Sequence, residues 1–426
     1  MENMERAFGI LQSVLKEKKN YFEETSKVVK RDNLSKEENY KLVQFVGSFL
    51  RNYYFICYVE EYLYCTKKID VTILLGLYYI NCSYIKLYEQ DEARERLAEH
   101  LKDYDLELSE IQKRVLDDIC KQRRNYYFNT LQKGGLESLS VRFNLPKWFI
   151  KMMFKQYGKD VALKTCKAIA KMPVQFCVKN DFVPLTVEEQ TLFHDLDEIR
   201  PGLFEYKGHS SLRKHPLVKK RKVFQAQAAY MDLFDELGEM KDKAVSIYLG
   251  NKNNIYYNIL SRYAADNTIN IFTKHLYENY DLLTKIRDYH LNKTVHYNEA
   301  NEDGLDTYLA DKPQDLILYW ANSSEFEDFR TEPDSTVVFD PTTLDDFVTN
   351  ELEGLKALKS HVALNGQLVY AVRTIGLKET KNIVEEFLKD NKEFELVSDK
   401  QFFPYEDSNS IFYYAIFKRV AGKDEN

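Results

Sequence analysis

The sequence predicts an all-α bundle at the N-terminus, followed by an α/β region built on a mostly parallel sheet. Apolar residues recur at helical spacing through residues 3–130. From residue 240 onward, short apolar runs typical of strands alternate with segments typical of helices. This alternation favours a doubly wound sheet with helices on both faces. A chain of 426 residues has room for two or three such domains.

The N-terminal part, residues 1–133, is expected to contain about five helices. One begins at Ser35, which forms a capping-box pattern with Glu38 three residues later. Residues 70–90 are so apolar that they predict a central, buried helix. Another helix is expected to begin at Ser109. The pair of glycines at 134 and 135 then ends the bundle.

The middle part, residues 134–235, is expected to be mixed. Residues 146–172 predict two helices joined near Gly158, and residues 173–180, PVQFCVKN, predict a strand. A loop-rich stretch follows. Within it, residues 206–222 contain seven Lys or Arg residues and no acid.

The last part, residues 236–426, contains the strand signals of the α/β region. Candidate strands are KAVSIYL, TINIFT, KTVHYN, DLILYWA and GQLVYAVRT, with helical segments between most of them. EFELVSD and SIFYYAIFKR are expected to pair as an antiparallel edge. Ligands of such sheets bind at the carboxyl ends of the strands, where the strand order reverses. A functional site is therefore expected there.

Composition limits the classes of function. The net charge of −7 means that the chain as a whole is no polyanion binder, so only local patches could bind nucleic acid. No apolar run approaches the ~20 residues that span a bilayer, and the charged N-terminus lacks the apolar stretch of a signal peptide. We therefore expect a cytoplasmic protein without a membrane partner. All six cysteines lie at or before Cys177.

Five segments, in matching order and spacing, resemble the bacterial 16S ribosomal RNA cytosine-C5 methyltransferases of the Sun/NOP type. These segments are SVRFNLPKWFIKMMFKQYG, PVQFCVKN, KVFQAQAAYMDLF, NGQLVYAVRTIGLKETKNIVEEFL and FFPYEDSNSIFYYAIFKR. The resemblance covers nearly the whole chain. It implies a NusB-like, RNA-binding type of domain in 1–133, an RNA-recognition subdomain in 134–235, and a Rossmann-type S-adenosylmethionine methyltransferase fold in 236–426.

The family's chemistry needs a cysteine thiolate that attacks the cytosine ring and a second cysteine that helps to release the product. Arg373 stands at the first position, in the run Tyr-Ala-Val-Arg-Thr, and Ser323 stands at the second. An arginine stays protonated and has no nucleophilic lone pair. A serine needs a strong base beside it, and the sequence shows none. We therefore expect no catalytic residue, and interpret the chain as a degenerate homologue.

The cofactor loop of the family is also eroded. In place of its glycine-rich motif the chain has a stretch that includes Ser246, Tyr248, Gly250, Asn251, Lys252 and Asn253. Ser246 is expected at the strand-end position of the family's aspartate. Thr273 or Lys274 replaces the acid that would bind the ribose hydroxyls. We therefore expect that the chain binds no cofactor. The alternative is that it binds S-adenosylmethionine.

The basic segment and the strand before it are the best candidates for contacts with ribosomal RNA. The candidate residues are Lys179, Asn180, Arg213, Lys214, Lys219, Lys220, Arg221 and Lys222. A solvated loop is the alternative interpretation. His209 and His215 have no carboxylate or cysteine at metal-ligand spacing, so no metal site is expected.

Residues 299–355 contain sixteen Asp or Glu residues against Lys312 and Arg330. This acidic stretch repels phosphate, and it could recruit a basic protein partner or be ordinary solvated surface. Three functions therefore stay open. The chain could be an inactive methyltransferase homologue that binds RNA or ribosomes, an active S-adenosylmethionine-dependent RNA methyltransferase, or a protein-binding scaffold.

Overall fold

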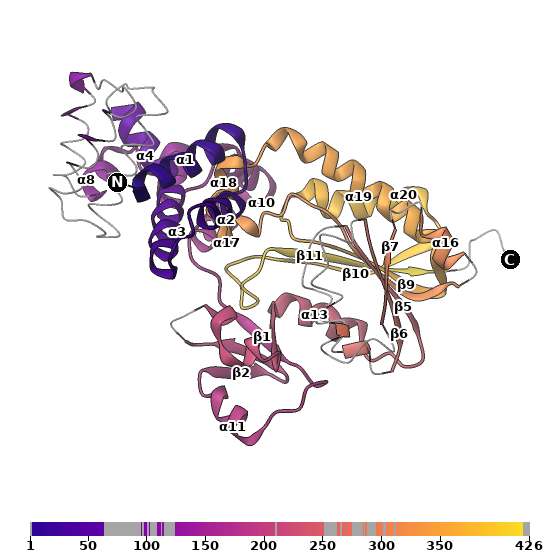
Figure 1. Cartoon of the computed structure of the whole chain (residues 1–426). Helices are drawn as coiled ribbons and strands as arrows, with labels where there is room; N and C mark the ends of the chain where they lie inside the picture. The colour runs from indigo at the N-terminus through magenta and orange to yellow at the C-terminus, as the bar shows by residue number, and fades with distance from the viewer. Residues whose placement is uncertain are drawn as a thin grey trace. The chain divides into compact units, whose positions relative to one another are not determined.

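The computed structural model describes most of the chain. The described residues are 2–63, 124–208, 211–250, 262–264, 266–274, 295–300, 304–310 and 312–420, with 95, 98–99, 102, 109–111, 113–114, 284 and 286–287. They group into two compact units (Figure 1). The helical unit comprises Met1–Lys171 and Asp328–Asp340, and the sheet unit comprises Met172–Glu327 and Pro341–Asn426. The three-part division at residues 133 and 235 remains a prediction.

The helical unit is built almost entirely from helices. Its elements are α1 (Glu2–Glu17), α2 (Tyr21–Arg31), α3 (Lys36–Leu50), α4 (Tyr53–Cys57), the π-helix η1 (Tyr58–Leu63), α8 (Arg124–Thr130), α9 (Leu136–Phe143), α10 (Lys147–Ile169), α17 (Asp328–Thr331) and α18 (Ser335–Val338). The capping box of Ser35 and Glu38 is confirmed, with both of its hydrogen bonds formed. The apolar helix predicted at 70–90, and most of the one after Ser109, lie outside the described residues.

Helix α10 has the break that the sequence predicts. Gly158 takes a φ of +75° and a ψ of 172°, which only glycine adopts without strain. The two halves of α10 therefore point in different directions and bury separate apolar stripes. The buried residues are Phe149, Ile150 and Met153 before the break, and Ala162, Thr165, Cys166 and Ile169 after it.

The segment Asp328–Asp340 completes the core of the helical unit, although it follows the fourth strand of the large sheet in sequence. The ring of Phe339 stacks on Trp148 with centroids 5.5 Å apart, and Phe329 meets Phe149 at 5.2 Å. The Asp334 carboxylate accepts a hydrogen bond from the backbone N–H of Tyr21, at 2.9 Å. The helical unit is therefore assembled from two separate stretches of the chain.

The sheet unit begins with a small antiparallel sheet of order β2-β3-β1-β4. Its elements are β1 (Phe176–Lys179), α11 (Val187–Gln190), η3 (Thr191–Phe193), β2 (Leu196–Arg200), β3 (Leu203–Tyr206), η4 (Leu212–Lys214), α12 (Pro216–Lys219) and β4 (Val223–Ala226). The strand predicted at 173–180 is confirmed as β1. One face of this sheet shares a core with α13 (Ala228–Leu237) and the large sheet. The other face packs on α12 and the loops around it.

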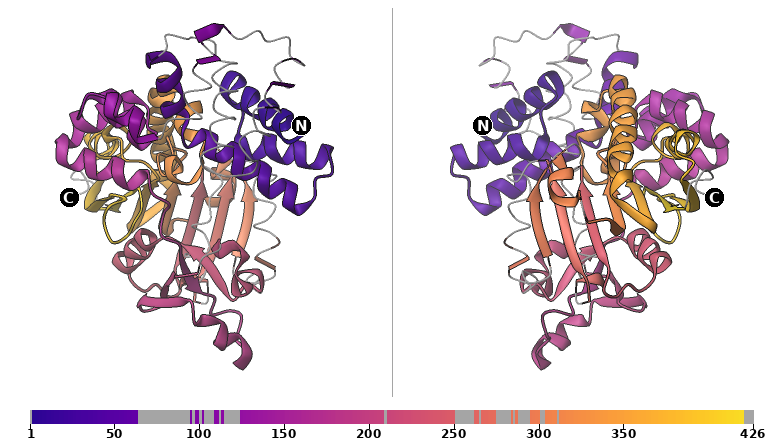
Figure 2. Two further views of the ribbon diagram at one scale, coloured as in Figure 1. Left: turned by 90° about the vertical axis from the view of Figure 1, so that its left-hand side faces the viewer. Right: turned by 90° about the vertical axis from the view of Figure 1, so that its right-hand side faces the viewer.

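The large sheet has seven strands in the order β10-β11-β9-β8-β5-β6-β7. They are β5 (Ala244–Leu249), β6 (Thr268–Thr273), β7 (Val295–Glu299), β8 (Gln314–Trp320), β9 (Val362–Val372), β10 (Phe394–Phe402) and β11 (Phe412–Arg419). β5 to β9 pair in parallel, and β11 pairs antiparallel with both β9 and β10. The strands run side by side in both views of Figure 2. The predicted mostly parallel sheet with an antiparallel edge is confirmed.

Helices cover both faces of the large sheet. One apolar core joins it to α13, and the other joins it to α19 and α20. The elements on and beside the second face are α16 (Asp306–Leu309), η7 (Pro341–Thr343), α19 (Leu344–Leu358), η8 (Lys359–His361), η9 (Leu377–Glu379) and α20 (Lys381–Asp390). No helix within the described ranges is long and apolar enough to cross a bilayer.

Candidate functional site

The strand order reverses between β5 and β8, because β6 and β7 extend the sheet to one side and β9 to the other. In open α/β sheets, the carboxyl ends of the strands at this point form the ligand site. Here the two strand ends are very close. The Gly250 amide donates to the Trp320 carbonyl at 2.8 Å, and a Cβ on Gly250 would lie 2.9 Å from the Asn322 nitrogen. Only glycine fits here.

Ser323 follows β8 and Arg373 follows β9, so the fold brings to neighbouring strand ends the two residues that the sequence resemblance aligns with cysteines. Glu325 joins them. Its carboxylate accepts a hydrogen bond from the Ser323 hydroxyl at 3.0 Å and one from Nη1 of Arg373 at 2.7 Å. Only 16% of the Arg373 side chain and 13% of the Glu325 side chain are exposed, so this ion pair is largely shielded from water.

The sequence interpretation missed Glu325, which is a base beside Ser323. Its carboxylate is already bound by the Arg373 guanidinium. Ser323 is itself buried. The arrangement therefore offers no exposed nucleophile.

A second buried cluster lies beside the first. The Glu379 carboxylate accepts hydrogen bonds from the Ser324 amide and the Ser324 hydroxyl, both at 2.7 Å, and one from the Thr374 hydroxyl at 3.2 Å. The Tyr370 hydroxyl donates to the Glu379 backbone carbonyl at 2.8 Å. These bonds tie the loop after β8 to the loop after β9 and to η9.

Glu351, on α19, adds a third carboxyl group to this region. It is fully buried and lies against the side chains of Tyr370 and Glu379. The pKa of Glu351 lies well above its ordinary value, mainly because the carboxyl group is buried and secondly because the Glu379 carboxyl is close to it. Because the hydrogen bonds from Ser324 and Thr374 favour the ionised form of Glu379, the proton of this pair belongs to Glu351.

The described cofactor positions do not fit S-adenosylmethionine well. Ser246 is the third residue of β5 rather than its end, and its hydroxyl bonds to Gln314 at 2.8 Å, which corrects the expected placement. Tyr248 is also a strand residue, buried against Tyr319. The residues that end β5 and β6 in the described chain, up to Gly250 and Lys274, supply no carboxylate for a ribose. Asn251, Lys252 and Asn253 lie outside the described residues.

The structure corrects part of the predicted RNA-contact set. Asn180 is fully buried, and its side chain donates to the Arg221 carbonyl at 2.8 Å and accepts from the Phe182 amide at 3.1 Å. Lys222 is mostly buried and donates to the Pro184 carbonyl at 2.7 Å. Both side chains hydrogen-bond to backbone groups of the small sheet and so stabilise its fold. The sequence does not reveal these contacts, because the partners are mostly distant along the chain.

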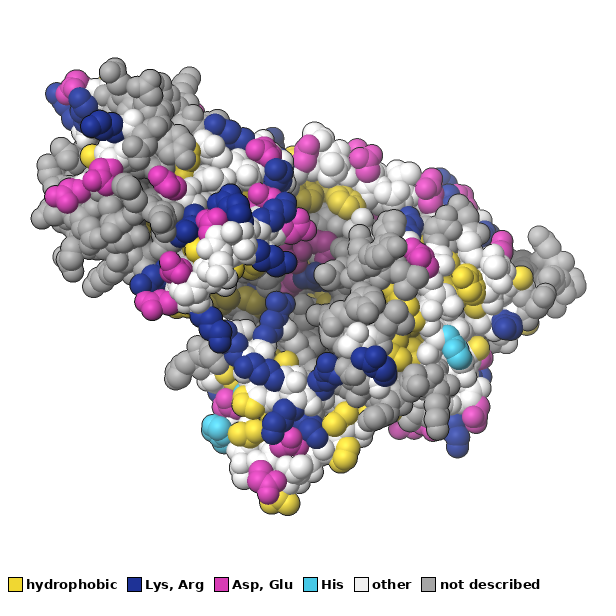
Figure 3. Space-filling model, in the orientation of Figure 1, with side chains coloured by type: hydrophobic (Ala, Val, Ile, Leu, Met, Phe, Trp, Pro, Cys, Tyr) yellow, Lys and Arg dark blue, Asp and Glu magenta, His cyan; other side chains and the backbone are white. Residues whose placement is uncertain are grey.

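The remaining basic residues differ in their surroundings. Lys220 lies 3.3 Å from Glu189 and Lys179 lies 3.2 Å from Asp181, so both have an acidic partner. Arg213, Lys214 and Lys219 are exposed, and no carboxylate pairs with them in the described chain. In Figure 3, Lys and Arg side chains lie among acidic ones on the lower part of this face, where β1, β2 and α11 are labelled in Figure 1.

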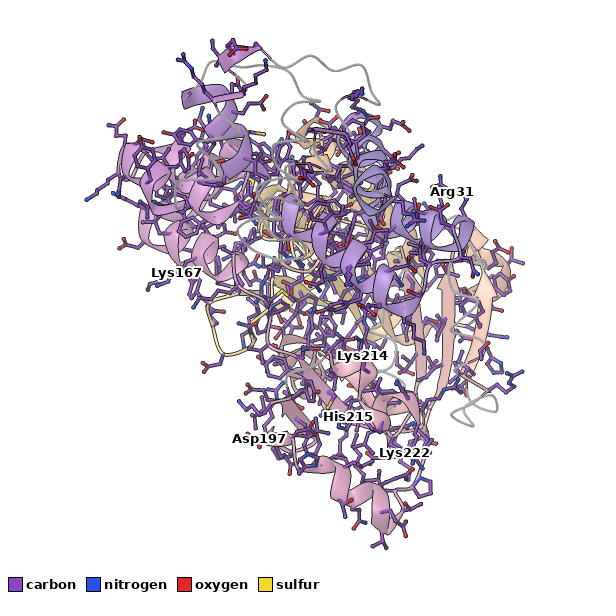
Figure 4. The ribbon with its side chains drawn as sticks, turned by 60° about the vertical axis from the view of Figure 1, so that its left-hand side comes forward. Arg31, Lys167, Asp197, Lys214, His215 and Lys222 are labelled. Carbon is purple, nitrogen blue, oxygen red and sulfur yellow. The ribbon has the colours of Figure 1, made fainter. Side chains whose placement is uncertain are left out.

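His215 positions this basic segment. Its Nδ1 caps α12 by accepting from the Leu217 amide at 3.2 Å, so its Nε2 must carry the proton that faces Asp195 at 3.1 Å. Figure 4 labels Lys214, His215 and Lys222 in this part of the sheet unit. The histidine is a structural support. No group of histidines, cysteines and acids in the described parts of the chain could hold a metal ion.

The acidic stretch 299–355 is not one surface. Glu327 and Glu351 are buried in the sheet unit. Asp334 is buried in the helical unit. The expected acidic face is therefore reduced to the exposed acids of separate elements, such as Asp345 and Asp346 at the start of α19.

Comparison with known proteins adds evidence on the fold. No protein-family model matches the chain, and no curated protein matches it. The crystal structure of PH0851 shares the fold with a TM-score of 0.75 at 14% identity, over 98% of this chain and 99% of that one. A methyltransferase homologue from Pyrococcus horikoshii gives 0.55 at 13% identity, over 68% of this chain and all of its own. NSun6 from Pyrococcus horikoshii, determined with SFG, gives 0.57 at 12% identity, over 65% and 98%.

These likenesses show the fold alone: a helical region followed by a Rossmann-like methyltransferase domain. The fold class expected from the sequence is thereby confirmed.

Proposed function

We propose that this chain is a catalytically degenerate homologue of the ribosomal RNA cytosine-C5 methyltransferases that retains RNA binding. The loss of catalysis is inferred from one observation. The two positions that would hold the cysteines are joined by Glu325 into a buried network of Ser323, Glu325 and Arg373. Replacing Arg373 with a cysteine would remove the guanidinium that pairs with Glu325 in this network.

RNA is the proposed partner because of the exposed, unpaired cations of the segment around α12. Arg213, Lys214 and Lys219 lie within seven residues of one another on a support fixed by His215. Cations held in this way bind phosphate through release of counterions. We also propose that residues 1–133 form a NusB-like domain and that 134–235 form the RNA-recognition subdomain, as the sequence resemblance implies.

Two measurements test the proposal. Purified protein with radiolabelled S-adenosylmethionine and ribosomal RNA should transfer no methyl group. The variant with both Ser323→Cys and Arg373→Cys should also stay inactive, because the cofactor positions do not fit. Methylation of cytosine by the unchanged chain would refute the degenerate assignment.

RNA binding is tested separately by filter binding. The triple variant Arg213→Ala, Lys214→Ala, Lys219→Ala should weaken the affinity for RNA about tenfold or more. It should also reduce the slope of log affinity against log salt concentration by about two. The matched control replaces three exposed lysines of α20 and the following turn, Lys381, Lys389 and Lys392, with alanine. If the control weakens binding equally, the segment around α12 is not the contact.

A further inference from the structure

Helix α10 of the helical unit carries a second concentration of positive charge. From residue 142 to 171 the chain has eight Lys or Arg residues and one acid, Asp160. The basic residues are Arg142, Lys147, Lys151, Lys155, Lys159, Lys164, Lys167 and Lys171. This is a large local excess in a chain whose net charge is −7. It lies outside the segment 206–222.

The fold turns these lysines outward. Lys147, Lys151 and Lys155 follow one another at four-residue intervals, and all three are exposed opposite the buried Phe149, Ile150 and Met153. After the break at Gly158, Lys164 and Lys167 are exposed three residues apart, and the exposed Lys171 lies two residues beyond the end of the helix. Such spacings place side chains on one face of a helix, about 6 Å apart along its axis. In Figure 4, Lys167 is labelled on the outer side of these helices.

Most of this charge is not neutralised within the molecule. Lys147 pairs with Glu137. In the described chain, no carboxylate forms an ion pair with Lys151, Lys155, Lys159, Lys167 or Lys171. An ordinary solvated helix face mixes both signs, as α2 and α3 do through Lys27 with Glu24 and Lys41 with Glu37. The single sign on α10 therefore indicates an anionic partner.

The side chains of this face indicate which class of anionic partner it binds. Within α10, which is described throughout, no large apolar side chain is exposed. Membrane-surface helices insert an apolar face, but here that face is buried in the core. Protein interfaces usually anchor on buried aromatic or aliphatic residues, which this face lacks. Regularly spaced point charges without an apolar anchor suit the phosphates of a nucleic acid.

We propose that the lysine face of α10 binds the phosphate backbone of RNA, independently of the basic segment around α12. This inference rests on the proposed RNA-binding function and adds a second contact surface on the other unit. Its contacts are with phosphate and therefore supply affinity without sequence preference.

The test uses the full chain and a ribosomal RNA fragment at several KCl concentrations. A variant with Lys151, Lys155, Lys167 and Lys171 replaced by glutamine should lose at least tenfold in affinity near 150 mM KCl. The slope of log affinity against log salt should fall by about three, as expected for four phosphate contacts on single-stranded RNA. The matched control replaces four other exposed lysines of the same unit, Lys27, Lys30, Lys36 and Lys41, with glutamine, and should stay within twofold.

Each outcome separates the two proposals. If the unchanged chain binds no RNA, the proposed function fails, and this inference with it. If the chain binds RNA and the α10 variant keeps the same affinity and slope, only this inference is overturned. The last arm tests whether the chain sediments with vesicles that contain phosphatidylserine. If the α10 variant loses this sedimentation but keeps its RNA binding, the face binds a membrane surface instead.

Discussion

Replacing Glu351 with glutamine should stabilise the sheet unit, and the gain should increase as the pH rises. Glu351 is fully buried between Tyr370 of β9, Glu379 of η9 and Glu325 of the loop after β8. Ionising it would place a negative charge beside two other carboxyl groups in a region that water does not reach. Glutamine keeps the shape of the side chain and removes the ionisable group.

The sign and size follow from proton linkage. Burial raises the pKa of Glu351 well above 4.5, so the folded state keeps a proton that the unfolded state releases. Stability is therefore fully present below about pH 4.5, and it is lost as pH rises toward the folded-state pKa. Each pH unit in this window corresponds to about 1.4 kcal/mol. Within this window, Glu351→Gln should therefore gain up to about 1.4 kcal/mol per pH unit relative to the unchanged chain.

The assay is urea unfolding at pH 5, 6, 7 and 8, followed by tryptophan fluorescence. The chain has two tryptophans, Trp148 in the helical unit and Trp320 in the sheet unit. A Trp148→Phe background leaves the fully buried Trp320 to report on the sheet unit alone. The control is Glu353→Gln, which removes an exposed carboxylate from the same helix and should leave the pH slope unchanged.

The reasoning fails if the difference in stability between the unchanged chain and Glu351→Gln is constant from pH 5 to 8. A constant difference would mean that Glu351 is ionised in the folded state throughout. A loss of stability at every pH would mean that the carboxyl group makes hydrogen bonds that glutamine cannot replace.

Three further predictions concern single contacts. Gly250→Ala should cost about 1–3 kcal/mol, because its Cβ would collide with backbone atoms after β8; an unchanged urea midpoint would contradict the close approach. Phe339→Ala should cost the helical unit about 2–3 kcal/mol by removing the ring stacked on Trp148. Trp148 fluorescence measures that loss, and an unaltered transition would count against the packing. Arg373→Ala should cost about 1–3 kcal/mol by removing the guanidinium that pairs with the Glu325 carboxylate, and adding Glu325→Gln should recover most of it; additive losses would show that the two residues are not coupled.

The elements that sequence predicted best are those with strong local signals. The capping box of Ser35, the break at Gly158 and the strands of the large sheet each follow from neighbouring residues. The order of the strands then brings Ser323 and Arg373 to neighbouring strand ends.

The interior of the site could not be predicted, because it depends on contacts between distant residues and on one backbone turn. Glu325 reaches Arg373 through a left-handed turn, with φ of 51°, which nothing in the local sequence requires. Glu351 lies in an acidic run that is typical of solvated surface, yet packing against Tyr370 buries it. Asn180 resembled a contact residue, but the carbonyl of Arg221 engages its side chain.

The split origin of the helical unit has a consequence for its biosynthesis. Residues up to Lys171 leave the ribosome well before Asp328–Asp340, whose Phe329 and Phe339 complete the packing around Trp148. At typical translation rates the delay is roughly 10–30 s. During this interval the nascent N-terminal helices expose an apolar seam that only later-made chain can close. The ordinary rule that an N-terminal domain finishes folding first therefore does not hold for this protein, and chaperones that bind nascent chains should find their site around Trp148 and Phe149 at the start of α10.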